Sequence, residues 1–168
     1  IVATVDMASL AGYRDRLILE ILYGAGLRIG EVLALKLHHV DAVGEVIFVE
    51  QGKGGKDRRL PMNQAVKAFL LGYLEWVRPT LFIRGDGRGE DFLVLGDRGR
   101  PMNKCRLSKN IREYGKRAGI SWLHAHEFRH AMSVHLMRRG CDVRYVSALL
   151  GHSHLKATET YTHVEDFD

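Results

Sequence analysis

One β-rich hairpin stands in a chain whose apolar residues otherwise recur at helical spacing. Residues 45–50 (EVIFVE) predict a strand, residues 58–61 predict its antiparallel partner, and the turn formers of residues 52–57 join them. Elsewhere apolar residues recur every three or four positions between glycines and capping residues. We therefore expect an α+β fold, mostly α-helical with one small antiparallel sheet.

The helical pattern divides the rest of the chain into seven segments. Helices are predicted over residues 10–23, from Arg28 through Leu35, from the N-cap Asn63 through Val77, from the N-cap Asn103 to about Gly119, over residues 125–139, over residues 142–151, and in a short last segment that contains Tyr161. Residues 84–91 predict a loop, and residues 92–95 predict one further short strand.

Length and composition favour a single cytoplasmic domain. A chain of 168 residues is long enough for one full-sized core. Its longest apolar stretches, such as residues 68–74, fall short of the ~20 residues that cross a bilayer, so no membrane partner is expected. Cys105 and Cys141 lack metal-ligand spacing and are typical of reduced cysteines.

Basic residues are concentrated in two stretches of a chain whose net charge is +5. One stretch spans residues 98–117 and the other spans residues 53–59. Such stretches suit a polyanion, although a solvated helix face would have a similar composition. The candidate polyanion contacts are Lys56, Arg58, Arg59, Lys104, Arg106 and Lys109.

Arg28 follows Gly26 and Leu27 at a predicted helix start. Backbone amides favour an anion there, and a guanidinium adds a rigid fork that matches phosphate oxygens. Glu31 lies three positions further on and is expected either to orient this guanidinium or to be a solvated helix acid.

Residues 126–130 (HEFRH) have two interpretations. His-Glu-x-x-His is the zinc-protease pattern, in which two histidines hold the metal and the glutamate is the base. That interpretation needs a third ligand, for which His152 or Glu159 is available, but it leaves Arg28 and the basic stretches without a role. We favour the other interpretation, in which His126 and Arg129 share one helix face and serve the same site.

Residues 149–164 (LLGHSHLKATETYTHV) are the most informative stretch for function. His152 follows a predicted helix end, where its imidazole can face a bound phosphate, and Tyr161 follows nine positions later. A phenol with a pKa near 10 needs nearby positive charge to act as a nucleophile at neutral pH. Arg28, Arg129 and His152 would supply that field.

These motifs closely resemble those of the tyrosine recombinase (integrase) family of DNA breaking and rejoining enzymes. The resemblance rests on Arg28, on the His-x-x-Arg of residues 126–129 and on the Gly-His-x8-Tyr of residues 151–161, and it spans about residues 17–164. In that family a catalytic lysine lies in a Gly-Lys-Gly turn, which Lys53 matches better than Lys56. Phe128 replaces the more frequent leucine before the arginine.

The resemblance implies a mechanism that uses neither a metal ion nor another cofactor. Tyr161 would form a 3′-phosphotyrosyl bond, while Lys53 would protonate the leaving 5′-oxygen. The other implied catalytic residues are Arg28 and Arg129, which would hold the phosphate oxygens, and His126 and His152, which would assist in proton handling and phosphate binding.

The same resemblance implies the partners and the extent of the domain. The partners would be double-stranded DNA, contacted by the basic stretches, and further recombinase subunits in a tetrameric synapse. Residues 1–168 would form one catalytic domain, without the N-terminal core-DNA-binding domain of most members. The alternatives are a zinc-dependent hydrolase built on residues 126–130 and a catalytically silent DNA-binding relative.

Overall fold

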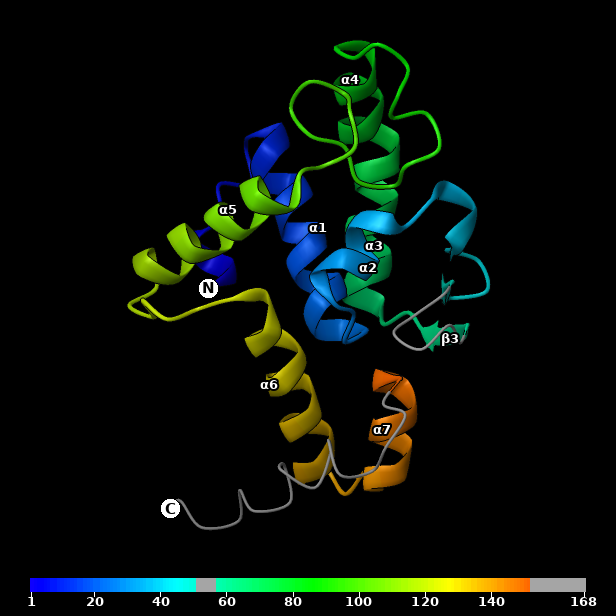
Figure 1. The fold of residues 1–168 in the computed structure, drawn as a ribbon, viewed down its shortest axis with the longest axis vertical. Helices are drawn as coiled ribbons and strands as arrows, with labels where there is room; N and C mark the ends of the chain where they lie inside the picture. Colours follow the sequence, from blue (N-terminus) through cyan, green and yellow to red (C-terminus); the bar gives the residue numbers. More distant parts are fainter. Residues whose placement is uncertain (51–56, 152–168) are drawn as a thin grey trace.

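The computed structural model describes residues 1–50 and 57–151 and has the expected α+β architecture (Figure 1). Its elements in chain order are a 3-10 turn (Val2–Thr4), α1 (Leu10–Gly24), α2 (Ile29–Ala34), a 3-10 turn (Leu37–His39), β1 (Val40–Asp41), β2 (Val46–Val49), β3 (Arg58–Pro61), α3 (Gln64–Gly72), a π-helical turn (Tyr73–Val77), α4 (Arg78–Ile83), α5 (Lys104–Arg117), α6 (Ala125–Arg138) and α7 (Val143–Leu150).

Helix α1 is the central element of the fold. Its N-cap is Ser9, whose hydroxyl accepts a hydrogen bond from the Gly12 N–H at 3.0 Å. Leu17, Ile18 and Leu22 are fully buried, and the helix contacts α2, α3 and α6. Because α1 contacts both the segment that carries Arg28 and the helix that carries Arg129, it fixes the distance between them.

The sheet is antiparallel in the order β1-β2-β3. Burial alternates along β2 and β3, with Ile47, Val49 and Leu60 facing the core. Val49 pairs with Arg58, so Arg58 lies at the start of β3, beside the connection to β2. That connection, where the sequence predicts a hairpin turn, lies outside the described residues.

Two local predictions in the middle of the chain are wrong. The helix expected to end at Val77 continues to Ile83 through the π-helical turn, which accommodates Pro79 near the start of α4. Residues 92–95 are not a strand. They form two isolated bridges, Lys36 with Phe92 and Leu95 with Pro101, instead of a continuous ladder.

Helices α6 and α7 extend from the main body as a pair (Figure 1). They share a small apolar cluster of Met132, Val146 and Leu150, which is separate from the main core. Phe128 at the start of α6 belongs to the main core, so the pair is anchored at that end. Within the described residues, no helix has both the length and the apolar character of a membrane span.

Candidate active site

Arg28 is the N-cap of α2, in extended backbone conformation (φ −75°, ψ 151°). Its backbone N–H donates to Oε2 of Glu31 at 2.8 Å, and Nη1 of its guanidinium donates to Oε1 at 2.9 Å. Glu31 therefore orients Arg28, as one of the two sequence interpretations anticipated. The Arg28 side chain remains 30% exposed.

The same Glu31 carboxylate binds a second arginine, Arg58. Nη1 and Nη2 of Arg58 donate to Oε1 and Oε2 at 3.0 and 2.7 Å, which is a bidentate pair. Burial by itself would raise the pKa of the Glu31 carboxyl, but the hydrogen bonds from Arg58 and Arg28 outweigh it and hold that pKa below its usual value. Glu31 is therefore an ionised carboxylate shared by two guanidinium groups.

The sequence nominates Arg58 only as a polyanion contact, whereas the structure gives it a partner within the protein, Glu31. The Arg58 side chain is only 10% exposed, whereas Arg59 is exposed and lies over the ring of Phe48, with its guanidinium carbon 4.9 Å from the centroid. The signal that separates the two is strand alternation, since Arg58 and the buried Leu60 share one face of β3.

Arg129 is buried at the junction of three segments. Its Nη1 donates to the Gly26 carbonyl at 2.5 Å, and its Nη2 donates to the carbonyl of Leu150. Gly26 has φ +62°, a backbone conformation that favours glycine, and a Cβ there would also displace the end of Met132, whose Cε would lie 2.2 Å away. Arg129 thus ties the turn before Arg28 to the last residue of α7.

The C-cap of α7 completes the cluster. Gly151 adopts the left-handed conformation (φ 62°, ψ 43°), and a Cβ on it would lie 3.3 Å from Nη1 of Arg58. Arg58 and Arg129 therefore both reach the end of α7, and Glu31 joins Arg28 to the same group. Two guanidinium groups on one carboxylate, with Arg129 at the same end of α7, give this place a net positive charge, which suits a phosphodiester.

Of the other four predicted catalytic residues, the structure describes only His126. His126 is exposed in the first turn of α6, three residues before Arg129. Lys53, His152 and Tyr161 lie outside the described residues, as does Lys56 among the predicted DNA contacts. In sequence, His152 directly follows Gly151.

The predicted contacts on α5 are exposed. Lys104, Arg106 and Lys109 all face solvent, although Arg106 also pairs with Asp97 at 3.4 Å. Lys104 lines a cavity of about 450 Å³ together with Arg28 and Glu31. The first turn of α5 is therefore continuous with the arginine cluster.

The zinc-protease pattern has a structural explanation. The Glu127 carboxylate accepts a hydrogen bond from the His124 N–H at 3.1 Å and so caps the N-terminus of α6. His126 and His130 are both exposed on the same helix. Among the described residues, neither histidine lies close to two further side chains that could bind a metal, and the suggested third ligands, His152 and Glu159, lie outside those residues.

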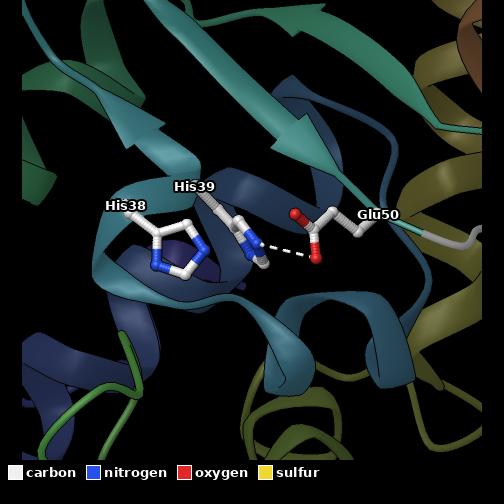
Figure 2. Close-up of side chains that lie close together, drawn as sticks. All are labelled: His38, His39 and Glu50. Atoms are coloured by element: carbon white, nitrogen blue, oxygen red, sulfur yellow. Dashed lines mark ion pairs between the residues drawn. The ribbon is translucent and has the colours of Figure 1, made fainter.

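One group of possible metal ligands lies elsewhere, and the sequence analysis did not find it. Ligand atoms of His38, His39 and Glu50 lie within 4.8 Å of one another (Figure 2). However, Nδ1 of His39 accepts the Lys36 N–H at 3.1 Å, so the ring proton belongs on Nε2, which faces Glu50 at 3.4 Å. A metal ion bound to Nε2 would shift the ring proton to Nδ1. There it would oppose the Lys36 N–H, which now donates to Nδ1. The donor set therefore fits a His–Glu pair better than a metal centre.

The fold and the arginine cluster agree with the tyrosine recombinase resemblance drawn from the sequence. The chain belongs to the phage integrase family, whose family model matches residues 1–167. It is 41% identical over 165 residues to tyrosine recombinase XerC 2 of Ralstonia nicotianae, covering 98% of this chain and 46% of that protein. It is 37% identical over 162 residues to tyrosine recombinase XerD of Staphylococcus aureus, covering 96% and 54%.

Solved structures agree with these relatives. The crystal structure of XerA recombinase superposes with a TM-score of 0.81 at 30% identity, covering 98% of this chain and 59% of that one. XerH recombinase, bound to its difH substrate in a pre-cleavage complex, superposes with a TM-score of 0.80 at 25% identity, covering 99% and 47%. The chain spans about half the length of the curated relatives it matches.

Proposed function

We propose that residues 1–168 act as the catalytic domain of a site-specific recombinase that cuts and rejoins double-stranded DNA. The observation that carries the proposal is the arginine cluster at the end of α7, in which Arg28 and Arg58 share Glu31 and Arg129 binds the carbonyls of Gly26 and Leu150. A cluster of this kind stabilises the extra negative charge of a pentacoordinate phosphate. The similarity to Xer recombinases, one of them bound to its DNA substrate, supports the choice of DNA.

In the proposed reaction the Tyr161 phenolic oxygen attacks the phosphorus. A phosphorus–oxygen bond to tyrosine forms as the phenol gives its proton to His126 or His152. The bond to the 5′-oxygen breaks, and Lys53 gives a proton to that oxygen. Arg28 and Arg129 hold the nonbridging oxygens, and His126 and His152 assist in proton handling and phosphate binding. Attack by a 5′-hydroxyl on the phosphotyrosine reverses these steps and rejoins the strands.

The proposal includes the setting of this reaction. Further subunits of the same recombinase would assemble with this one on DNA. The free thiols of Cys105 and Cys141 suit a reducing compartment, so we place the reaction in the cytoplasm.

A nicked DNA substrate tests the proposed function directly. Cleavage next to the nick releases a short fragment whose 5′-hydroxyl diffuses away, so the covalent protein–DNA adduct accumulates. We expect the wild-type chain to form an adduct that survives denaturing electrophoresis and disappears on protease treatment. Absence of the adduct at a protein concentration that saturates the DNA would overturn the recombinase assignment.

The choice of Lys53 as the proton donor has its own test. Lys53→Ala should cut an ordinary substrate slowly but recover with a 5′-sulfur leaving group, because a thiolate leaves without protonation. Lys56→Ala is the matched control and should need no such rescue. Rescue of Lys56→Ala alone would exchange the two roles.

Binding to duplex DNA should weaken steeply as salt rises, because its contacts are mainly to phosphates. Each neutralised phosphate adds about 0.9 to the slope of log affinity against log salt. Lys104→Ala should therefore lower the magnitude of the slope by about one. Lys67→Ala is the control, since Lys67 pairs with Glu45 at 2.7 Å. Equal slopes for Lys104→Ala and the wild type would remove Lys104 from the interface.

A further inference from the structure

Arg58 and Arg28 make different sets of hydrogen bonds with the Glu31 carboxylate. Arg58 occupies both carboxylate oxygens through its side chain, whereas the Arg28 side chain shares only Oε1. The second oxygen is also taken by the Arg28 backbone N–H. Both Glu31 oxygens thus accept two hydrogen bonds each among the described residues.

The Arg58 side chain is also more buried than the Arg28 side chain. The Arg58 side chain is 10% exposed and the Arg28 side chain is 30% exposed, with Glu31 between them at 11%. Arg58 is therefore the inner partner of the carboxylate, and Arg28 is the outer one. The outer guanidinium is the better placed of the two to meet a phosphate arriving from solvent.

The pairing has a consequence for Arg28. Without Arg58, an ionised Glu31 would be left with Arg28 as its only side-chain partner among the described residues, and a carboxylate binds guanidinium best as a bidentate pair. That pair would use the donor fork that a phosphate needs. With Arg58 in place, Arg28 gives Glu31 a single side-chain hydrogen bond, and no other group in residues 1–50 and 57–151 takes the rest of its five donors.

Arg58 also packs against the C-terminal end of α7. A Cβ on Gly151 would lie 3.3 Å from Nη1 and 3.4 Å from Cδ of Arg58, which places this side chain directly against the C-cap of α7. The residue after Gly151 is His152, the proposed phosphate ligand. Arg58 thus joins Glu31, the partner of Arg28, to the end of α7, which Arg129 also binds.

We propose that Arg58 is a positioning residue for DNA cleavage, which holds Glu31 so that Arg28 keeps its donors for the scissile phosphate. The inference rests on the proposed recombinase function. Arg58 acts through Glu31 and Arg28, so its loss should slow the chemical step more than it weakens DNA binding. This distinguishes it from the outer basic residues, whose loss should weaken binding.

The test compares Arg58 with its neighbour Arg59, which carries the same charge on the exposed face of β3. Single-turnover cleavage of the nicked substrate is measured at saturating protein, and the Kd for the duplex is measured separately. Arg58→Met should be slower by at least about tenfold, since ångström-scale misplacement in an active site can cost about a hundredfold. Arg59→Met loses a proposed DNA contact, so its Kd should weaken at least as much as in Arg58→Met, while its cleavage rate at saturating protein should fall less than in Arg58→Met.

A lysine variant keeps the test decisive if Arg58→Met does not fold. Arg58→Lys retains the charge but offers Glu31 no fork, so it should remain slower than the wild type by about tenfold and should also be slower than Arg59→Lys. Thermal unfolding identifies which variants are folded. Wild-type cleavage by Arg58→Lys would overturn the inference.

Coupling to Glu31 provides a readout that general destabilisation would not produce. If Arg58 acts through Glu31, Glu31→Gln combined with Arg58→Lys should be no slower than the slower single variant. Multiplication of the two single losses would overturn the inference. Its failure differs from failure of the recombinase assignment, because in the latter case the wild type and the Arg59 variants would also form no adduct.

Discussion

Replacing Tyr161 with phenylalanine should abolish the covalent protein–DNA adduct and leave DNA binding nearly unchanged. The substitution removes only the phenolic oxygen, which is the proposed nucleophile, and keeps the ring. We would measure the adduct on the nicked substrate by denaturing electrophoresis and the affinity on an intact duplex. The expected fall in adduct is complete, while Kd should change by less than about twofold.

A second tyrosine provides the matched control. Tyr145 is 55% exposed on α7 and has no proposed role in the reaction, so Tyr145→Phe should form adduct like the wild type. An adduct that persists in Tyr161→Phe and vanishes in Tyr145→Phe would reassign the nucleophile. An adduct that persists in both would point to a nucleophile other than these two tyrosines.

Removing either proposed phosphate-binding arginine should slow cleavage by about a hundredfold or more, by analogy with loss of an oxyanion-hole donor. This applies to Arg28→Ala and to Arg129→Ala, measured as single-turnover rates at saturating protein. Arg28→Lys should recover little activity, because an ammonium group cannot reproduce the planar fork. Full activity in Arg28→Lys would contradict bidentate recognition of the phosphate.

The two arginines should differ in their effect on stability. Arg129→Ala leaves the buried carbonyls of Gly26 and Leu150 without their donor, at a cost of about 1–3 kcal/mol for each group left unsatisfied. Arg28→Ala leaves Glu31 paired with Arg58 and should unfold at nearly the wild-type denaturant concentration. Denaturant unfolding of both variants checks this difference. Equal stability would show that Arg129 does not hold the α7 end in place.

The helices could be predicted well because their ends are decided locally. Asn63, Asn103 and Asp142 each accept a hydrogen bond from a backbone N–H two or three residues further on, so short stretches of sequence contain the whole signal. The prediction failed for residues 92–95 and missed β1, because short extended segments depend on partners elsewhere in the chain.

In the candidate site, too, the sequence predicted local contacts and missed those between distant segments. The sequence nominated Arg28 and Arg129 from motif spacing, and it offered Glu31 as a partner for Arg28, since three residues on a helix define a local contact. It grouped Arg58 with Arg59 by charge alone. The structure separates these two neighbours because one faces the core and the other faces solvent.

By itself, the sequence determined the fold class and the caps of several helices, and it nominated residue types suited to phosphodiester chemistry. Only the tertiary structure decided that Glu31 serves two arginines and that Arg129 joins two backbone segments. Arg58 lies 27 residues from Glu31, and Arg129 lies 103 residues from Gly26. Hydrogen bonds over such separations depend on how α1, the sheet and the α6–α7 pair pack together. Local periodicity carries no information about that packing, so these contacts had to be observed.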